Sequence, residues 1–296
     1  MSYISPEDLK KLQYVLIEML KEFDKICRDN NIEYFVFAGT ELGAVRHKGI
    51  IPWDDDTDVG MMRSEFEKLK KVFAEQDTGN LILGSPDGNY EWHERLYPRI
   101  YYKGTVAELK YWRDSFELCD EKNARPIFMD IFLFDYTDND LNKIEKIAKK
   151  TTRLKRNYMY YRFQSKVIKD RGLSAFIFSL IKRMKYTIHS SDPDAGKKQY
   201  VKYLKLISHE KSDYIVTYDD PVINDVLTSL IRYDQSFPTI DCMFNGVSVK
   251  LRNGYDYALK NIYHDYMQYP PEDKRDTHET YSVQFGDFKF PDNLEF

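Results

Sequence analysis

The stretch from Gly39 to Gly60 constrains this chain most, because it places aspartates of one parity shortly after a small-residue turn. It reads Gly-Thr-Glu-Leu-Gly-Ala-Val-Arg-His-Lys-Gly-Ile-Ile-Pro-Trp-Asp-Asp-Asp-Thr-Asp-Val-Gly. Residues 56–62 are predicted to form a strand, on which Asp56 and Asp58 would point to the same face. Close carboxylates repel one another unless a cation lies between them, and hard oxygen ligands suit Mg²⁺ or Mn²⁺.

A solvated acidic loop is the alternative interpretation, and most aspartate clusters are loops of that kind. Here apolar side chains surround the acids, namely Trp53, Val59 and Met61. Charged groups among apolar neighbours need a partner, so we expect these carboxylates to bind a cation rather than water alone.

The residues before the acids predict a strand that leads into a phosphate-binding turn. The apolar run Ile32–Ala38 is predicted to be a buried strand that delivers Gly39 and Thr40 to the site. Gly39 would let backbone N–H groups approach an anion, and residues 40–46 could form a short helix whose N-terminus faces it. The cationic side chains that follow could neutralise phosphate charge or simply face solvent: Arg46, His47 and Lys48.

A second strand, Pro126–Phe134, is the most apolar in the chain and carries Asp130 in its middle. A lone carboxylate there costs on the order of several kcal/mol unless it is paired or metal-bound. We expect Asp130 to share the metal site with Asp56 and Asp58, because adjacent strands lie about 5 Å apart. The alternative is an ion pair with Arg99 or Arg125 that serves only the fold. Asp135 is expected to end the strand as a turn residue.

Local signals predict many of the remaining elements. Ser5 and Pro6 mark a helix start, and Asn30-Asn31 its end. The other expectations are a capping box at Ser64–Glu67, a β-meander over residues 81–113, a type I′ hairpin turn at Asn245-Gly246 and a last helix over Tyr255–Met267.

Composition narrows the class of protein. The chain has 296 residues and a formal net charge of −4, which argues against nucleic acid as its main partner. The three cysteines, Cys27, Cys119 and Cys242, lack metal-ligand spacing and suit a reducing cytosol. The N-terminus has no signal-peptide core, and no stretch reaches the roughly 18 apolar residues of a membrane span. We expect a cytoplasmic protein that at most touches the inner face of the membrane.

Residues 149–188 form a basic segment with twelve Lys and Arg residues against one acid, Asp170. Aromatic residues lie between the bases, as in helices that bind an anionic membrane surface. A solvated helical arm packed on the core is an equal alternative. The whole chain, residues 1–296, is predicted to be one domain with a helical insertion at about 141–210.

Three motifs resemble the LicD family of bacterial phosphocholine and related phosphoalditol transferases, which are related to animal fukutin-type proteins. Gly39–Gly49 with Ile51–Gly60 resembles the family signature, and Met129–Asp135 its second acidic strand. The C-terminal motif corresponds to Tyr263–Met267 with Pro270–Arg275. The resemblance predicts Gly where His264 stands and Pro where Phe132 or Leu133 stands. These departures touch backbone shape and leave the carboxylates in place.

The resemblance implies an α+β fold with a nucleotidyltransferase-like mixed sheet, flanking helices and a helical basic arm. It also implies a reaction in which a glycan hydroxyl attacks the distal phosphorus of a CDP-activated alcohol, foremost CDP-choline, and CMP leaves. The acceptor would be a precursor of lipopolysaccharide, capsule or teichoic acid, free or lipid-linked. Transfer of ribitol- or glycerol-phosphate is the alternative.

The roles implied for single residues follow from the same resemblance. Mg²⁺ or Mn²⁺ would be held by Asp54, Asp56, Asp58 and Asp130, and Asp130 could orient or deprotonate the acceptor hydroxyl. Asp56, Asp58 and Asp130 are thus the expected catalytic residues. The expected substrate-binding residues are Gly39, Thr40, Arg46, His47, Lys48, Trp53 and Arg99.

Two other classes of protein fit the acidic stretch less well. Asp54, Asp56, Asp58 and Glu65 fall at ligand positions of an EF-hand calcium loop, but Val59 stands where that loop needs Gly. Asp56-Thr57-Asp58 resembles the nucleophile motif of haloacid-dehalogenase phosphatases, which should directly follow a hydrophobic strand. Here Pro52-Trp53-Asp54-Asp55 precedes it.

Overall fold

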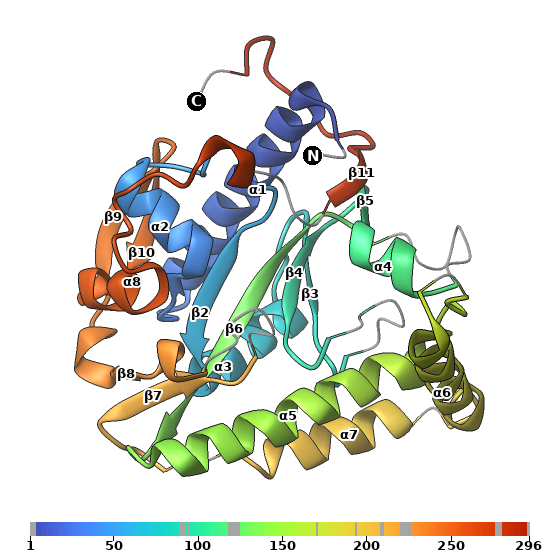
Figure 1. Cartoon of the computed structure of the whole chain (residues 1–296). Coiled ribbons are helices and arrows are strands. Elements are labelled where there is room, and N and C mark those ends of the chain that lie inside the picture. The colour runs from blue at the N-terminus through green and yellow to red at the C-terminus, as the bar shows by residue number, and fades with distance from the viewer. Residues whose placement is uncertain are drawn as a thin grey trace.

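A mixed sheet around one long strand, β6 (Phe128–Thr137), organises the chain in the computed structural model (Figure 1). The structure describes residues 4–88, 93, 95–117, 125–169, 171–192, 194–207, 210–219, 226–275 and 280–294. Within these residues the sheet has seven strands in the order β1-β2-β6-β4-β3, with β7 on β6 and β8 on β7. This mixed sheet with flanking helices confirms the predicted α+β fold class. Its other strands are β1 (Phe35–Val36), β2 (Asp58–Met62), β3 (Leu81–Gly84), β4 (Arg99–Tyr102), β7 (Tyr214–Thr217) and β8 (Ile231–Arg232).

β6 is central because it uses both edges along its length. It pairs with β2 in parallel on one edge. On the other edge, β4 pairs antiparallel with its first residues and β7 with its last. Between β4 and β7 the carboxylate of Asp219 accepts a hydrogen bond from the Leu133 backbone N–H at 3.2 Å. The Asp219 side chain therefore satisfies a backbone N–H of β6 at a point where neither β4 nor β7 pairs with that strand.

Helices surround the sheet (Figure 1). In this view α5 and α7 lie below the sheet and α6 lies at the lower right corner, whereas both chain ends are at the top. The helices are α1 (Pro6–Asp29), α2 (Ala38–Arg46), α3 (Arg63–Glu75), α4 (Lys110–Ser115), α5 (Leu141–Arg162), α6 (Leu173–His189), α7 (Ala195–Leu204) and α8 (Tyr255–Tyr263). Two small sheets pair β9 (Ile240–Phe244) with β10 (Val247–Leu251), and β5 (Val106–Leu109) with β11 (Thr280–Gln284). No helix in the described part of the chain is both long and apolar enough to cross a membrane.

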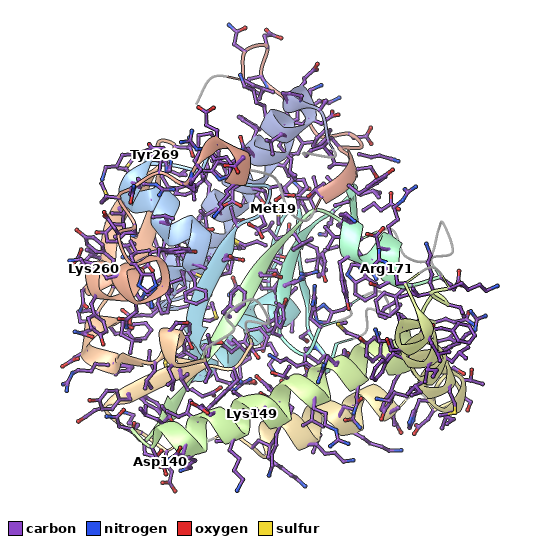
Figure 2. The ribbon with its side chains drawn as sticks, in the orientation of Figure 1. Met19, Asp140, Lys149, Arg171, Lys260 and Tyr269 are labelled. Carbon is purple, nitrogen blue, oxygen red and sulfur yellow. The ribbon has the colours of Figure 1, made fainter. Side chains whose placement is uncertain are left out.

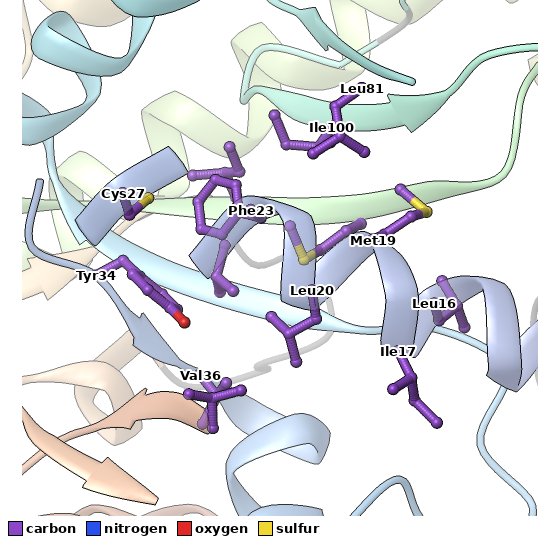
Figure 3. Close-up of a cluster of buried hydrophobic side chains, with 14 of the residues drawn as sticks. Leu16, Ile17, Met19, Leu20, Phe23, Cys27, Tyr34, Val36, Leu81 and Ile100 are labelled. Atoms are coloured by element: carbon purple, nitrogen blue, oxygen red, sulfur yellow. The ribbon is translucent and has the colours of Figure 1, made fainter. Parts of the chain in front are cut away.

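α1 supplies the largest share of the core. Its start is as predicted, since the Ser5 hydroxyl accepts a hydrogen bond from the Asp8 N–H at 3.0 Å and Pro6 is the first helical residue. Its apolar stripe, which includes Met19 and Phe23, packs on the sheet in one buried cluster (Figure 3). Each such side chain contributes roughly 1.5–3 kcal/mol of stability when buried. A second buried core cluster contains four phenylalanines: Phe35, Phe37, Phe132 and Phe134.

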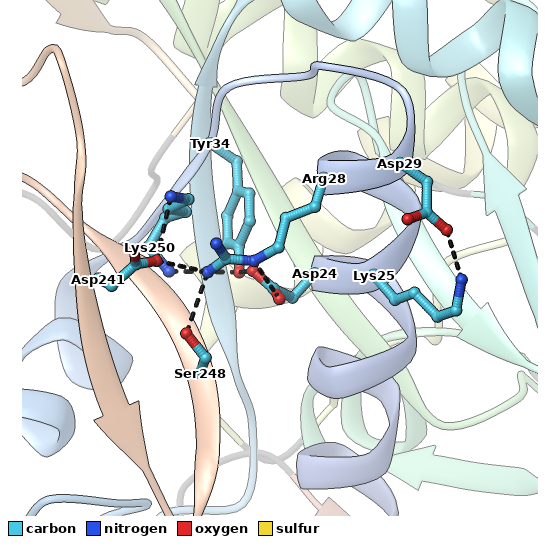
Figure 4. A network of polar contacts seen from close by, with 8 residues as sticks. All are labelled: Asp24, Lys25, Arg28, Asp29, Tyr34, Asp241, Ser248 and Lys250. Atoms are coloured by element: carbon cyan, nitrogen blue, oxygen red, sulfur yellow. Dashed lines mark hydrogen bonds and ion pairs between the residues drawn. The ribbon is translucent and has the colours of Figure 1, made fainter.

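A polar network ties α1 to the β9–β10 hairpin (Figure 4). Arg28 donates from Nε to Asp24 and from Nη2 to Asp241, each at 2.6 Å. The hydroxyl of Tyr34 donates to the other oxygen of Asp24 at 2.8 Å. The hairpin itself turns at Asn245 and Gly246, with φ of 46° and 80°, which confirms the predicted turn.

Several predicted boundaries are wrong. The strand expected over residues 32–38 spans only Phe35–Val36, because α2 already begins at Ala38. The capping box at Ser64 is absent, since β2 runs directly into α3 and Met62 is the N-cap. Of the expected meander only the pairing of β3 with β4 is present among the described residues, because β5 pairs with β11 and residues 110–115 form α4. α8 ends at Tyr263, before Met267. Cys27 and Cys242 are free thiols, and Cys119 lies outside the described residues.

Candidate active site

Asp58, Asp130 and Arg99 form a row across three neighbouring strands. Asp58 on β2 and Arg99 on β4 are both register partners of Asp130 on β6. Register partners project from the same face of a sheet, and their strands lie about 5 Å apart. The predicted neighbourhood of Asp58 and Asp130 therefore follows from the strand register.

Asp130 also forms the ion pair that was the alternative interpretation. Arg99 donates from Nε and Nη2 to the two oxygens of Asp130, the second at 3.2 Å. Its guanidinium carbon lies 3.8 Å from the centroid of the Phe128 ring. Arg99 is fully buried and its guanidinium is hydrogen-bonded to Asp130, while its contact with substrate stays a prediction. A carboxylate has about four acceptor sites, so Asp130 keeps capacity for a further ligand.

The first turn of α2 lies against the acidic loop. The Asp58 N–H donates to Thr40 Oγ1 at 2.7 Å, and its carbonyl accepts from the Phe37 N–H at 2.9 Å. A Cβ on Gly39 would lie 3.0 Å from Asp54 Oδ2, so glycine leaves room for that carboxylate. Gly39 and Thr40 are therefore helical residues rather than the separate turn that was predicted. The acids gather at the N-terminus of α2, where the helix dipole favours negative charge.

The loop between α2 and β2 is held by contacts that the sequence did not indicate. Asp55 accepts from the Thr280 N–H at 2.6 Å, which ties the loop to β11. Gln13 Nε2 donates to the Asp54 carbonyl at 2.8 Å. β2 begins only at Asp58, so the predicted strand over 56–62 is too long and strand alternation does not set the direction of Asp56.

A buried ion pair between Glu41 and Arg252 anchors α2 and was missed from the sequence. Arg252 donates from Nε to Glu41 Oε1 at 2.9 Å and from Nη2 to the other oxygen. Both residues are almost completely buried. Burial raises the pKa of Glu41, and the attraction of Arg252 opposes that rise. Only the spacing of Glu41 one residue after Thr40 could have drawn attention to it.

Asp135 is not the turn residue that was predicted. It lies inside β6, is buried, and accepts hydrogen bonds from Arg63 Nε at 2.8 Å and Nη2 at 2.7 Å. An odd separation of five residues on a strand places it on the opposite face from Asp130. A cavity of about 330 Å³ borders Arg63 and Asp135, away from the row of Asp58 and Asp130.

A cluster of rings and guanidinium groups, here called the aromatic cluster, adjoins the acidic loop. The ring of Tyr269 lies 5.2 Å from His47 and 6.3 Å from Trp53, between centroids. The guanidinium carbon of Arg275 is 5.3 Å from the Trp53 ring and 5.5 Å from the Tyr269 ring. That of Arg46 is 4.9 Å from Tyr269. The C-terminal motif therefore packs on the N-terminal signature; Figure 2 labels Tyr269 beside α2.

The predicted cations between α2 and the loop divide into two groups. Arg46 Nη1 donates to the Tyr266 carbonyl at 2.9 Å, which fixes it under the C-terminal segment. Burial, together with the charge of Arg46, lowers the pKa of His47. Lys48 instead sits exposed in the turn, where its carbonyl accepts from the Asn245 N–H at 2.8 Å. The described contacts bring His47, Arg46 and Trp53 together and leave Lys48 outside the cluster. Tyr269, which the sequence did not single out, completes it.

The backbone at His264 has a conformation that favours glycine. His264 follows α8 with φ of 56° and ψ of −109°. This conformation is strained for any residue with a Cβ and easy for glycine. The position therefore suits the Gly that the resemblance predicts there.

Comparison with known proteins agrees with these motifs. Residues 31–170 match the family model described as LicD/FKTN/FKRP, nucleotidyltransferase domain. The chain is 28% identical over 286 residues to the lipopolysaccharide cholinephosphotransferase LicD of Haemophilus influenzae, covering 91% of this chain and 95% of that protein. It is 37% identical over 78 residues to an uncharacterized protein of Rickettsia prowazekii, which covers 29% of that protein. Residues 31–170 of this chain are therefore similar to the LicD/FKTN/FKRP nucleotidyltransferase domain, and nearly the whole chain is similar to a LicD cholinephosphotransferase.

Proposed function

We propose that this protein is a phosphotransferase that moves phosphocholine from CDP-choline to a hydroxyl of a cell-surface glycan of the lipopolysaccharide type, releasing CMP. The match of residues 31–170 to the LicD/FKTN/FKRP model and the similarity to the Haemophilus cholinephosphotransferase over nearly the whole chain support this proposal. The observation that carries it is the register of Asp58 with Asp130 beside the N-terminus of α2. That arrangement places two carboxylates next to a helix end that favours anions.

The carboxylates at this site suit a divalent cation that binds together with the substrate. The described residues contain no group of three His, Cys, Asp or Glu side chains arranged to hold a metal by themselves. Mg²⁺ is commonly bound by one or two carboxylates together with substrate phosphates, so Asp58 and Asp130 suffice, with Asp54 and Asp56 as further candidates. When bound, the cation would neutralise charge on the diphosphate and on the leaving oxygen of CMP.

The chain's own residues then position the two reactants. The first turn of α2, with Gly39 and Thr40, faces the diphosphate with its positive end. Asp130, kept in place by Arg99, accepts the proton of the acceptor hydroxyl while that oxygen bonds to the distal phosphorus. The bond from that phosphorus to the oxygen of CMP breaks in the same displacement, and CMP departs with the electron pair.

The aromatic cluster favours choline over ribitol or glycerol as the donated alcohol. Trp53 and Tyr269 already hold one cation, the guanidinium of Arg275, and the trimethylammonium group of choline would bind these rings by displacing it. Quaternary ammonium groups bind aromatic faces in the same way. A neutral polyol has no comparable attraction, which makes CDP-choline the preferred donor.

The geometry disfavours the two other classes. An EF-hand loop lies between two helices, whereas the acidic loop here leads into β2. Glu65, its expected twelfth ligand, instead accepts from the Glu33 N–H at 3.1 Å and from Lys68 at 2.8 Å. A phosphatase nucleophile follows its strand, but Asp56 precedes β2.

The direct test is CMP release by the purified chain from a panel of donors. We expect turnover of CDP-choline with a glycan acceptor and Mg²⁺, and much slower turnover of CDP-ribitol, CDP-glycerol and CDP-ethanolamine. Excess chelator should abolish the activity, and added Mg²⁺ or Mn²⁺ should restore it. Equal activity in chelator would overturn the metal-dependent mechanism. Exclusive use of a CDP-alditol would retain the reaction class and replace the donor.

A further inference from the structure

α6 turns its apolar side to solvent, which is the reverse of an ordinary surface helix. The most exposed of its large apolar residues are Leu173 at 73%, Phe178 at 63% and Ile188 at 60%. A helix packed on a protein core normally buries such a stripe. Here the stripe follows the helical repeat along the outer face, through Leu173, Ile177, Leu180, Ile181, Met184 and Ile188, with Phe178 beside it.

Polar contacts hold α6 in this orientation. Ser179 is buried against the body, where its hydroxyl accepts from the Ile168 N–H at 3.1 Å. Lys185 Nζ donates to Asn157 on α5 at 2.7 Å, and Lys182 Nζ lies 4.9 Å from the Tyr160 ring centroid. The hydroxyl of Ser179 and the ammonium groups of Lys182 and Lys185 contact the body of the protein, so the apolar stripe on the other side of α6 faces solvent.

The charge around α6 identifies its partner. Residues 149–188 carry twelve basic residues and one acid. Exposed bases flank the helix and the neighbouring α5, among them Arg153, Arg156, Lys169 and Arg171. Figure 2 labels Lys149, another exposed base of this segment, on α5. Two copies of this surface would repel each other, whereas an anionic bilayer offers both negative headgroups and an apolar layer.

We propose that α6 lies in the headgroup region of an anionic lipid bilayer, with its apolar stripe inserted and the surrounding bases on the lipid phosphates. A helix of 17 residues is about 26 Å long, and Lys182, Arg183 and Lys185 interrupt its second half. These features suit a helix that lies parallel to the surface. This docking surface is separate from the candidate active site and does not depend on the donor.

The test uses the full chain and sedimentation with vesicles. Vesicles of phosphatidylcholine and phosphatidylglycerol in equal parts should bind the native protein, and vesicles of phosphatidylcholine alone should bind it far less. Binding should weaken steeply as salt rises, because salt screens the attraction between the bases and the anionic headgroups. The triple variant Ile177→Ser, Phe178→Ser, Met184→Ser should lose at least about tenfold in partitioning, since three inserted side chains are removed.

A matched variant separates this surface from general surface hydrophobicity. Val201→Ser, Ile240→Ser and Met243→Ser remove three similarly exposed apolar residues on α7 and β9. That variant should bind vesicles like the native chain, and both triple variants should keep the native melting temperature because the replaced side chains are exposed. A Phe178→Trp variant should lose fluorescence with brominated lipid beyond the loss seen for the native protein.

Three outcomes would overturn the proposal. The first is equal binding to neutral and anionic vesicles, and the second is undiminished binding by the α6 variant. The third is a native dimer, seen by analytical ultracentrifugation, that the α6 variant converts to monomer, because the stripe would then cover a second copy of the chain.

Discussion

Asp58 on β2 and Asp130 on β6 are direct register partners on adjacent parallel strands. The relationship places two carboxylates side by side on one face of the sheet, where like charges oppose each other. Arg99 pairs with Asp130 from the other edge of β6 and offsets part of this repulsion. One acid is therefore tied to a buried guanidinium, while the other lies at the start of its strand, partly exposed.

Asp58→Asn is expected to abolish transfer and leave the fold intact. The amide has the size of the carboxylate but no charge to hold a cation, and its loss relieves repulsion with Asp130. We expect CMP release to fall by about 10²-fold or more, with an unchanged or higher melting temperature. Asp29→Asn, an exposed aspartate on the far end of α1, is the control and should keep full activity. Turnover by Asp58→Asn near the native rate would exclude it from the site.

Asp130→Asn is expected to lower stability as well as activity. Breaking a buried pair leaves the guanidinium of Arg99 uncompensated, which costs about 3–5 kcal/mol. The double variant Arg99→Met, Asp130→Asn should recover much of that loss, because no unpaired charge stays buried. Urea unfolding of the single and double variants measures the coupling. If the double variant refolds fully and also regains activity, Asp130 serves only the fold.

Tyr269→Leu is expected to change donor selectivity. A cation on an aromatic face gains about 0.5–2 kcal/mol, so KM for CDP-choline should rise by roughly 2- to 30-fold. KM for CDP-glycerol should stay the same, because that donor has no ammonium group. Tyr257→Leu on α8 replaces a tyrosine of equal exposure, 49% in both cases, and provides the control. A parallel rise in KM for both donors would indicate a general loss of packing instead.

His264→Gly is expected to stabilise the protein. The positive φ of 56° at this residue disfavours a side chain, and relief of such strain is worth about 1–3 kcal/mol, less the flexibility that glycine adds to the unfolded chain. We therefore expect a net gain of about 1 kcal/mol in the free energy of unfolding. His264→Ala removes the imidazole and keeps the strain, so it should show no such gain. A lower stability of the Gly variant would mean that the imidazole makes a stabilising contact.

Stability is expected to fall above pH 10, and Tyr34 is one cause. Burial, with the nearby charge of Asp24, raises the pKa of Tyr34 well above its ordinary value of 10.0. Below pH 10 the phenol is protonated in the folded and the unfolded state, so its contribution to the free energy of unfolding is fully present. Above pH 10 the unfolded chain loses the proton and the folded chain keeps it, so the folded state becomes progressively less favoured. Urea unfolding between pH 8 and pH 11 should show this decline.

Tyr34→Phe provides the check on that assignment. The variant loses the hydrogen bond to Asp24, so its stability at pH 8 should be lower by about 1 kcal/mol. Its decline above pH 10 should be shallower than that of the native chain, because one titrating phenol is gone. Tyr257→Phe changes an exposed tyrosine and should leave the slope unaltered. Identical slopes for Tyr34→Phe and the native chain would rule out Tyr34 as a source.

The sequence was sufficient for features that depend on neighbouring residues. Ser5 and Pro6 predicted the start of α1, and Asn245-Gly246 predicted the hairpin turn, because capping and positive φ are properties of a few adjacent positions. The acidic signature predicted the resemblance to the LicD family that the family model over residues 31–170 also finds, and the apolar run around Asp130 predicted a strand. Asp135 was misread because a strand-end aspartate and a buried, paired aspartate have the same local sequence.

What only the tertiary structure decided are the pairings between distant segments. The partner of Glu41 is Arg252, and the aromatic cluster joins Trp53 to Tyr269 and Arg275. The sequence left a metal site shared with Asp58 and an ion pair with an arginine as alternatives for Asp130; the structure shows the ion pair with Arg99 and the register with Asp58, and the shared metal stays a prediction. The outward face of α6 was likewise undecided, since twelve bases and an apolar stripe fit either a buried or an exposed helix. These pairings depend on which polar and charged groups are buried together on folding, because a buried charge needs a partner. The whole fold determines which groups are buried together, and no single segment of the sequence does.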